Sequence, residues 1–196
     1  MTLPPVMRAF FAIELPIAVK QEINRWVNTL KPKAPVDAIR WVQPEHLHIT
    51  LQFLPALRSV DLPILVEQAC QALQASPPLE CYADKLMLLP NPHHPHVIAL
   101  AIMPQEALAL IAQALGDVMV ACHYPLEKRL FRAHLTVARI HQSRVDLDFL
   151  QQAPVPAAAA LTVKEVVLFR SEPGEHGSCY TRLATIPLAK TGKAHD

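Results

Sequence analysis

The sequence has little glycine, no excess of charge of either sign and no long uninterrupted hydrophobic run. It contains four glycines against 19 prolines in 196 residues, and its formal net charge at pH 7 is +1. A chain this close to neutral has no global field to hold a long nucleic acid, so a nucleic-acid role would need a local pocket. No run of about 18 apolar residues exists for a membrane span, and the N-terminal apolar stretch is too short for a signal peptide. We therefore expect a cytoplasmic protein without a membrane contact.

The sequence also lacks a paired cysteine motif. Cys70, Cys81, Cys122 and Cys179 lie far apart, and no C-x-x-C pair occurs. Cys70 and Cys122 fall on apolar helical stripes, where a free thiol packs as a small hydrophobic side chain. These positions favour buried free thiols in a reducing compartment over disulfides.

The hydrophobic content is 52%, which is enough for one domain or for two small lobes that share a core. Apolar residues at helical spacing predict helices at 19–30, 61–75, 105–122 and, more briefly, 146–152. Strand-like apolar runs lie at 8–15, 46–54, 80–89, 96–103, 133–140, 161–169 and 178–188. Because strands outnumber helices and hairpins occur, we expect an α+β fold with mainly antiparallel sheets. It should form one domain over 1–190, with a frayed tail at 191–196.

One short motif occurs twice. The pattern H-x-T-Φ, where Φ is apolar, is found at residues 48–51 (HITL) and 134–137 (HLTV), each time inside a predicted strand. Strand side chains alternate between the two faces of a sheet, so each copy places an imidazole and a hydroxyl on one face. Two such strands facing each other would bring together two histidines and two hydroxyl donors. This set suits phosphodiester chemistry without a metal, since histidine can act as a general acid or a general base.

The segments around these motifs resemble a known family. WVQPEHLHITLQFL and FRAHLTVARI are similar to the paired signature of the 2H phosphoesterase superfamily, and more closely to that of the RNA 2′,3′-cyclic phosphodiesterases, also called 2′-5′ RNA ligases. RAFFAIELP resembles the family's opening strand and LFRSEPGEHGSCYTRLATIPL its closing hairpin. The chain departs from the family pattern at Pro55, usually glycine, at Ala133, usually proline, and in VIALAI, which lacks the usual aromatic. The resemblance implies two pseudo-symmetric lobes of mainly antiparallel sheet, with outer helices, around a central cleft.

The resemblance also implies an activity. Family members hydrolyse RNA 2′,3′-cyclic phosphate ends to 2′-phosphates without a metal, and reversibly join or cleave 2′-5′ linkages. Carried over to this sequence, His48 is the expected proton donor and His134 the expected proton acceptor. Thr50 and Thr136 are the expected ligands of the phosphate oxygens. Arg139 is a further phosphate ligand by resemblance, although strand alternation turns it to the opposite face unless the strand ends or bulges there.

Four other residues are candidate substrate contacts. Phe11 and Trp41, like Phe10, are core residues by default, yet one of these three could stack a base, as could Tyr180. Arg132 belongs to a basic stretch, LEKRLFR, that suits an RNA end better than a long duplex. We expect a monomer without a cofactor, whose partners are RNA ends or small nucleotides.

Three other interpretations stay open. The chain could be a 2H enzyme for a small nucleotide, such as a 2′-5′ oligonucleotide or a cyclic ADP-ribose phosphate. It could be a non-catalytic nucleotide-binding module, although two intact motif histidines argue against this. It could bind a metal, because His46 shares the predicted strand face with His48 and NPHHPH adds further histidines. No third ligand at a recognised spacing supports a metal site, and we expect none.

Overall fold

The computed structural model describes residues 3–127, 129–142, 145–151, 153–156, 160–174 and 177–189. Within these ranges the strands are β1 (Val6–Glu14), β2 (Ile39–Trp41), β3 (His48–Arg58), β4 (Leu79–Leu89), β5 (Val97–Met103), β6 (His134–Ile140), β7 (Leu161–Val163), β8 (Glu165–Gly174) and β9 (Gly177–Pro187). The helices are α1 (Ile17–Leu30), α2 (Leu62–Leu73) and α3 (Gln105–Ala121). Single 3-10 turns, η1 to η4, lie at Lys31–Lys33, Pro44–His46, Ser59–Asp61 and Asp148–Leu150.

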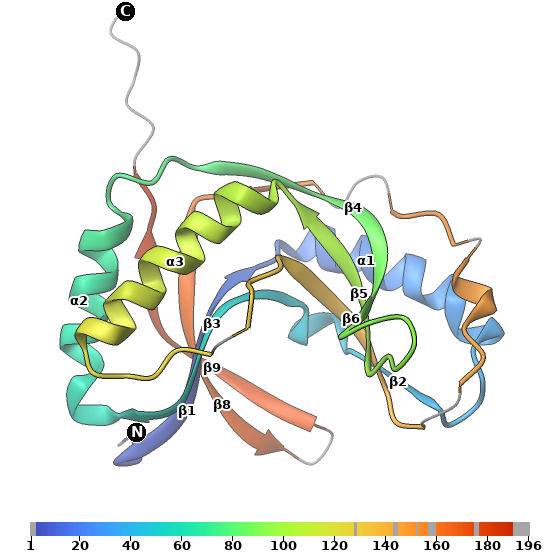
Figure 1. Ribbon diagram of the computed structural model, residues 1–196, viewed down its shortest axis with the longest axis horizontal. Helices are drawn as coiled ribbons and strands as arrows, with labels where there is room; N and C mark the ends of the chain where they lie inside the picture. The colour runs from blue at the N-terminus through green and yellow to red at the C-terminus, as the bar shows by residue number, and fades with distance from the viewer. Residues whose placement is uncertain are drawn as a thin grey trace, which may run out of the picture.

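The strands form one curved antiparallel sheet (Figure 1). Its order is β7-β4-β5-β6-β3-β1-β8-β9, with β2 paired to β6. The sheet has two halves, which we call the first half (β1, β3, β8 and β9) and the second half (β2, β4, β5, β6 and β7). They meet where β3 lies beside β6, and among the described residues these strands share one paired position, Ile49 with Leu135. The expected α+β fold with mainly antiparallel strands is confirmed.

The helices cross between the halves. α1 follows β1 of the first half, yet the indole nitrogen of Trp26 donates a hydrogen bond to the Pro154 carbonyl, which precedes β7 of the second half. α3 follows β5 of the second half, yet it packs against β3 and α2 of the first. Figure 1 shows the result, with α2 and α3 at one end of the molecule and α1 toward the other. Each half of the sheet is therefore in contact with a helix that follows a strand of the other half.

The predicted apolar stripe of α1 is confirmed in full. Its buried side chains are Val19, Ile23, Trp26, Val27 and Leu30. They join the main core, which fills the space between the helices and one face of the sheet. A second, smaller cluster lies on the opposite face around Phe10 and Phe169. This second cluster borders the site described below.

Two local predictions were wrong, and one short strand was not predicted. The helix expected at 146–152 is a single 3-10 turn at Asp148–Leu150 within the described residues. The strand expected from residue 46 begins at His48, because Pro44 starts a 3-10 turn that includes His46. The three-residue strand β2 was not predicted, since it is too short to show a periodic pattern. The expected tail at 191–196 lies outside the described residues.

The cysteines are free thiols, as predicted, and none of the four forms a disulfide. Cys81 is buried, and burial raises the pKa of its thiol to about 11. Cys70 and Cys122 are partly buried and Cys179 is exposed, which corrects the expectation that all four are buried. Across the ranges that the structure describes, no helix is long and apolar enough to cross a membrane.

Candidate active site

The two H-x-T copies lie on the two strands at which the halves meet. Ile49 pairs with Leu135, and both side chains are buried. In an antiparallel pair this register sets the histidine of each copy opposite the threonine of the other. The four motif side chains are partly exposed while their neighbours are buried, so all four share the open face of the sheet. The convergence predicted from the duplicated motif is therefore present.

Each copy is followed by a β-bulge at the same place. The pairing of β3 with β1 passes over Leu51, and the pairing of β6 with β5 passes over Val137. A bulge inserts one residue and reverses the alternation beyond it. The residue five positions after each histidine, Phe53 or Arg139, then returns to the open face, and Arg139 is exposed after two buried residues. The condition under which Arg139 reaches the motif face is thus met.

The two imidazoles are held in the same way. Nδ1 of His48 lies 2.7 Å from the His46 carbonyl oxygen, and Nδ1 of His134 lies 2.7 Å from the Arg132 carbonyl oxygen. A carbonyl only accepts hydrogen bonds, so Nδ1 carries the proton and donates in both rings. In the neutral ring Nε2 is then an unprotonated acceptor, which can take a proton, and the imidazolium can give one. Two proton-transfer groups of matched geometry result.

An aromatic wall, formed by Phe10, Phe169 and Tyr180, encloses His48. The ring centroids of Phe10 and Tyr180 lie 4.8 Å and 5.2 Å from that of His48. Phe169 stacks on Phe10 at 5.4 Å, and His46 meets the edge of Tyr180 at 5.2 Å. This wall excludes water from one side of the His48 ring.

Burial lowers the pKa of His48 from 6.5 to about 4. The hydrogen bond to the His46 carbonyl raises the pKa, but the neighbouring His46 ring and the positive charges of Lys20 and Arg139 lower it further. His48 is therefore neutral near pH 7 in the ligand-free protein. The same positive charges make this place favourable for an anion, and an anion beside the ring would raise the pKa again.

Glu14 is the register partner of His48 on β1. Its carboxylate forms ion pairs with Lys20, at 3.4 Å, and with Arg182. Burial acts to raise the pKa of Glu14, but the two cations outweigh burial and lower it. Lys20 also donates to the Glu45 carbonyl at 3.2 Å, which ties α1 to the turn before β3. The carboxylate beside His48 is thus neutralised, and sequence alone identified no partner for it.

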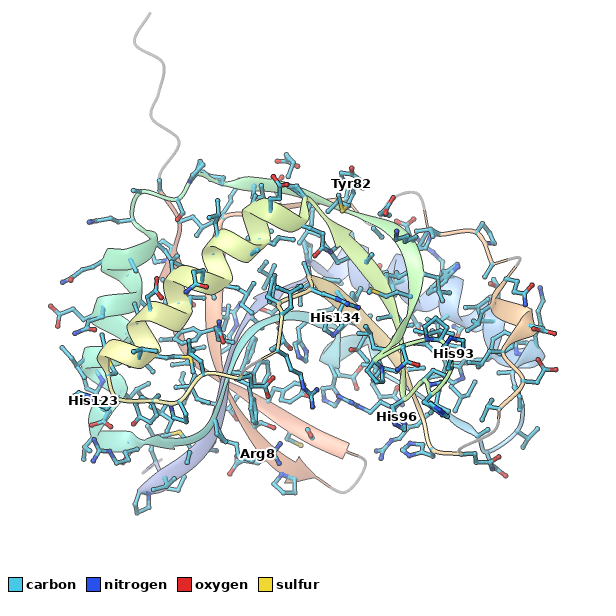
Figure 2. All side chains as sticks on the ribbon, in the orientation of Figure 1. Arg8, Tyr82, His93, His96, His123 and His134 are labelled. Carbon is cyan, nitrogen blue, oxygen red and sulfur yellow. The ribbon has the colours of Figure 1, made fainter. Side chains whose placement is uncertain are left out.

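A cavity of about 650 Å³ adjoins Thr50 and His134. β3 contributes residues 50–53 to its lining, and the turn between β4 and β5 contributes His96. The segment before β6 contributes Arg129 and Arg132. Figure 2 shows His134 near the centre of the molecule, with His96 and His93 to one side on the turn. This side of the site is open, and its largely apolar lining includes Arg129 and Arg132 together with Glu127.

The predicted substrate contacts fall in different places. Phe11 is fully buried in the main core, which removes it from reach of a substrate, and its neighbour Phe10 faces the site instead. Trp41 is partly buried against the same core. Tyr180 belongs to the aromatic wall, and Arg132 lines the cavity.

The sequence left open whether Phe10 or Phe11 faces the site, because alternation along β1 does not say which of the two faces the helices. The pairing of Phe10 with Phe53, on the strand that carries the first motif, decides it. Lys128, in the basic stretch, lies outside the described residues. Among the residues that are described, no group of three or more His, Cys, Asp or Glu side chains is arranged to hold a metal ion.

Comparison with known proteins gives a consistent picture. The model of the LigT-like phosphoesterase family matches residues 13–99, which include the first motif. The chain is 27% identical over 186 residues to the RNA 2′,3′-cyclic phosphodiesterase of Methanothermobacter thermautotrophicus, covering 93% of this chain and 99% of that protein.

Solved structures match along the same length. E. coli LigT complexed with 3′-AMP has a TM-score of 0.78 at 23% identity, covering 94% of this chain and 99% of LigT. A Thermus thermophilus protein has a TM-score of 0.76 at 24% identity, covering 94% of this chain and all of that one. Sequence and fold agree: the chain is similar to the LigT-like phosphoesterases over residues 13–99, and it has the fold of E. coli LigT along nearly its whole length.

Proposed function

We propose that this chain hydrolyses 2′,3′-cyclic phosphate ends of RNA to 2′-phosphates, without a metal, by acid–base catalysis from two histidines. The observation that carries the proposal is the register of Ile49 with Leu135, which sets each motif histidine opposite the threonine of the other copy. A phosphate placed among these four side chains would have a proton-transfer group on either side. In-line displacement at phosphorus needs this arrangement, since the attacking and leaving oxygens lie on opposite sides.

The proposed step moves one proton at each histidine. Water attacks phosphorus while Nε2 of His134 takes a proton from it. The bond from phosphorus to the ribose O3′ breaks, and His48 gives its Nε2 proton to that oxygen. The products are a 2′-phosphate and a 3′-hydroxyl. Each transfer is typically worth about 10²–10⁴-fold in rate.

The hydroxyls of Thr50 and Thr136 and the guanidinium of Arg139 are proposed to donate hydrogen bonds to the non-bridging oxygens. Such bonds strengthen as charge grows on those oxygens in the transition state. The positive charge of Arg139 already acts on His48, which supports its placement beside the phosphate.

The role of His48 as proton donor requires substrate to be bound. With its pKa at about 4, the free protein holds the ring neutral near pH 7. A phosphate anion beside the ring stabilises the imidazolium and raises that pKa. The substrate would thus bring about the protonation that its own cleavage needs.

Ligation follows from the same site when a 5′-hydroxyl replaces water. Attack of that hydroxyl on the cyclic phosphate forms a 2′-5′ linkage, and the reverse step cleaves it. By microscopic reversibility the histidines exchange proton roles between the two directions. We propose this activity as secondary to hydrolysis.

A second candidate is hydrolysis of a small nucleotide by the same chemistry. Two observations favour it: the cavity beside His134 has the volume of a small-molecule site, and E. coli LigT binds 3′-AMP in its crystal structure. Competition between a mononucleotide 2′,3′-cyclic phosphate and a tailed RNA would separate the two candidates. A much higher kcat/KM for the RNA favours the first, and equal values favour the second.

The test of the proposal uses a short RNA that ends in a 2′,3′-cyclic phosphate, with EDTA present. Wild type is compared with His48→Ala and His134→Ala, and His94→Ala on the exposed turn is the matched control. We expect a 2′-phosphate from wild type and control, and loss of turnover in both motif variants. Turnover that disappears under EDTA and returns with added metal would contradict the proposal.

A further inference from the structure

One side chain outside the motifs holds the backbone directly before the second histidine. Gln105 is the first residue of α3. Its side-chain amide nitrogen, Nε2, donates to the carbonyls of Ile102 at 2.9 Å and Ala133 at 2.8 Å. Its amide oxygen accepts from the Ala133 backbone N–H at 3.0 Å. Ala133 is fully buried, so this one side chain meets both polar groups of its backbone where water does not.

The contact reaches His134 through a rigid unit. The N–H of Ala133 and the carbonyl of Arg132 belong to the same planar peptide group. Gln105 binds that group at its N–H, and Nδ1 of His134 donates to its carbonyl at 2.7 Å. Any rotation of this peptide plane would therefore change the hydrogen bond that sets the His134 tautomer.

In the first half of the sheet, the peptide group that accepts from His48 is held by a different contact. There the carbonyl that accepts from His48 belongs to the peptide of His46 and Leu47. The N–H of that peptide donates to the Pro44 carbonyl at 3.2 Å, inside the 3-10 turn. Backbone holds the peptide in one half, and the Gln105 side chain holds it in the other. A single substitution can thus release His134 and leave His48 as it is.

We propose that Gln105 is a positioning residue for His134. By binding the peptide between residues 132 and 133, it keeps the His134 ring in the Nδ1–H tautomer, so that Nε2 is free to accept a proton. The importance of this for turnover rests on the proposed function, but the effect on the tautomer does not.

The test compares Gln105→Leu with Gln113→Leu, a control on the same helix whose exposed side-chain amide donates to Asp117. Imidazole ¹⁵N chemical shifts, recorded above the ordinary histidine pKa, report the tautomer of each ring without substrate. In Gln105→Leu we expect His134 to lose its preference for the Nδ1–H form while His48 keeps it. With cyclic phosphate RNA, kcat should fall about 10-fold, the usual effect of losing one well-placed hydrogen bond, with KM nearly unchanged.

Gln105→Glu provides a second variant: it keeps an acceptor for the Ala133 N–H but places a carboxylate oxygen, which cannot donate, against the Ile102 and Ala133 carbonyls. Because the bond to the Ala133 N–H remains, this variant should retain the His134 tautomer better than Gln105→Leu does. Unchanged ¹⁵N shifts of His134 in Gln105→Leu would overturn the proposal. So would a shift of His48 along with His134, since this indicates a general loosening of the fold. A shifted tautomer in a protein without turnover would support the positioning role and count only against the proposed function.

Discussion

The two halves of the sheet share a backbone plan and differ in the side chains around it. Each has an H-x-T strand, a bulge directly after the threonine and a carbonyl two residues before the histidine that accepts from Nδ1. In the first half an aromatic wall covers the histidine. In the second half the histidine adjoins an open cavity whose lining includes Arg129 and Arg132. The repeated backbone thus places the two histidines in equivalent positions, and their different surroundings can give them different roles.

The bulges show how far the equivalence goes. Phe53 and Arg139 occupy the same position relative to their histidines, yet one adds an aromatic ring and the other a cation. Phe53 packs against the smaller apolar cluster, and the charge of Arg139 lowers the pKa of His48 across the site. The side chain that differs at each equivalent position therefore gives the two halves different surroundings.

The largest effect should come from removing both histidines. Each single change, His48→Ala or His134→Ala, should lower kcat/KM for cyclic phosphate RNA by about 10²–10⁴-fold. Because the two act in one step, the double variant should lose little more than the worse single variant. Steady-state rates of the four proteins check this. Losses that multiply in full would indicate that the halves act independently.

The free energy of unfolding should depend on pH through His48 in the first half of the sheet. Above pH 6.5 the ring is neutral in both folded and unfolded chains, and its contribution to stability is complete. As pH falls from 6.5 toward 4, the unfolded chain takes up a proton that the folded protein does not, because burial holds the folded pKa at about 4. The free energy of unfolding should fall by up to about 3 kcal/mol from this group over that window.

Urea unfolding at a series of pH values checks the window. His48→Gln, which removes the titrating ring, should be less sensitive than wild type by about the same amount. A wild type and a His48→Gln variant with parallel pH curves would show that the aromatic wall does not hold the ring neutral.

The threonines should contribute next. Thr50→Val and Thr136→Val keep the shape of the side chain but remove a donor to the phosphate. Hydrogen bonds to charged groups are worth about 1.5–3 kcal/mol, so kcat/KM should fall about 10- to 100-fold in each variant. Thr162→Val, on the exposed face of β7, is the matched control. A loss of activity in only one of the two variants would mean that the phosphate contacts one threonine and not the other.

The smallest effect should come from opening the aromatic wall. Tyr180→Leu exposes the His48 ring to water, so its pKa should rise from about 4 toward 6.5. kcat/KM should fall about 2- to 10-fold, the range of a single aromatic contact. An NMR titration measures the pKa of His48, and steady-state rates measure kcat/KM. Tyr82→Leu, a half-exposed tyrosine on β4 labelled in Figure 2, is the control and should leave both unchanged.

Much of the fold was predictable because helices and strands have strong periodic patterns. The stripe of α1 and the strands that carry the motifs are local features, set by side-chain spacing along one segment. The turn at Pro44–His46 and the strand β2 escaped prediction because neither is long enough to show a period. The helix expected at 146–152 had the apolar residues of a helix but only a single turn of structure.

The sequence by itself determined which functional groups are present. Each copy of the repeated motif places one imidazole and one hydroxyl on the same face of its strand. Spacing of two along a strand is enough for that, whatever the strand pairs with. The tertiary structure decided what the sequence left open. Pairing of Ile49 with Leu135 set the motifs against each other, and the bulge after Thr136 turned Arg139 to their face.

Other decisions also needed contacts between segments far apart in the chain. Phe10 rather than Phe11 faces His48 because of the register of β1 on β3, and Gln105 reaches Ala133 across 28 residues of sequence. Burial and charge at His48 come from several segments that are separate in the sequence, so its pKa is a property of the assembled fold. Proton affinity and register depend on distances in space, and a local pattern of residue types does not contain them.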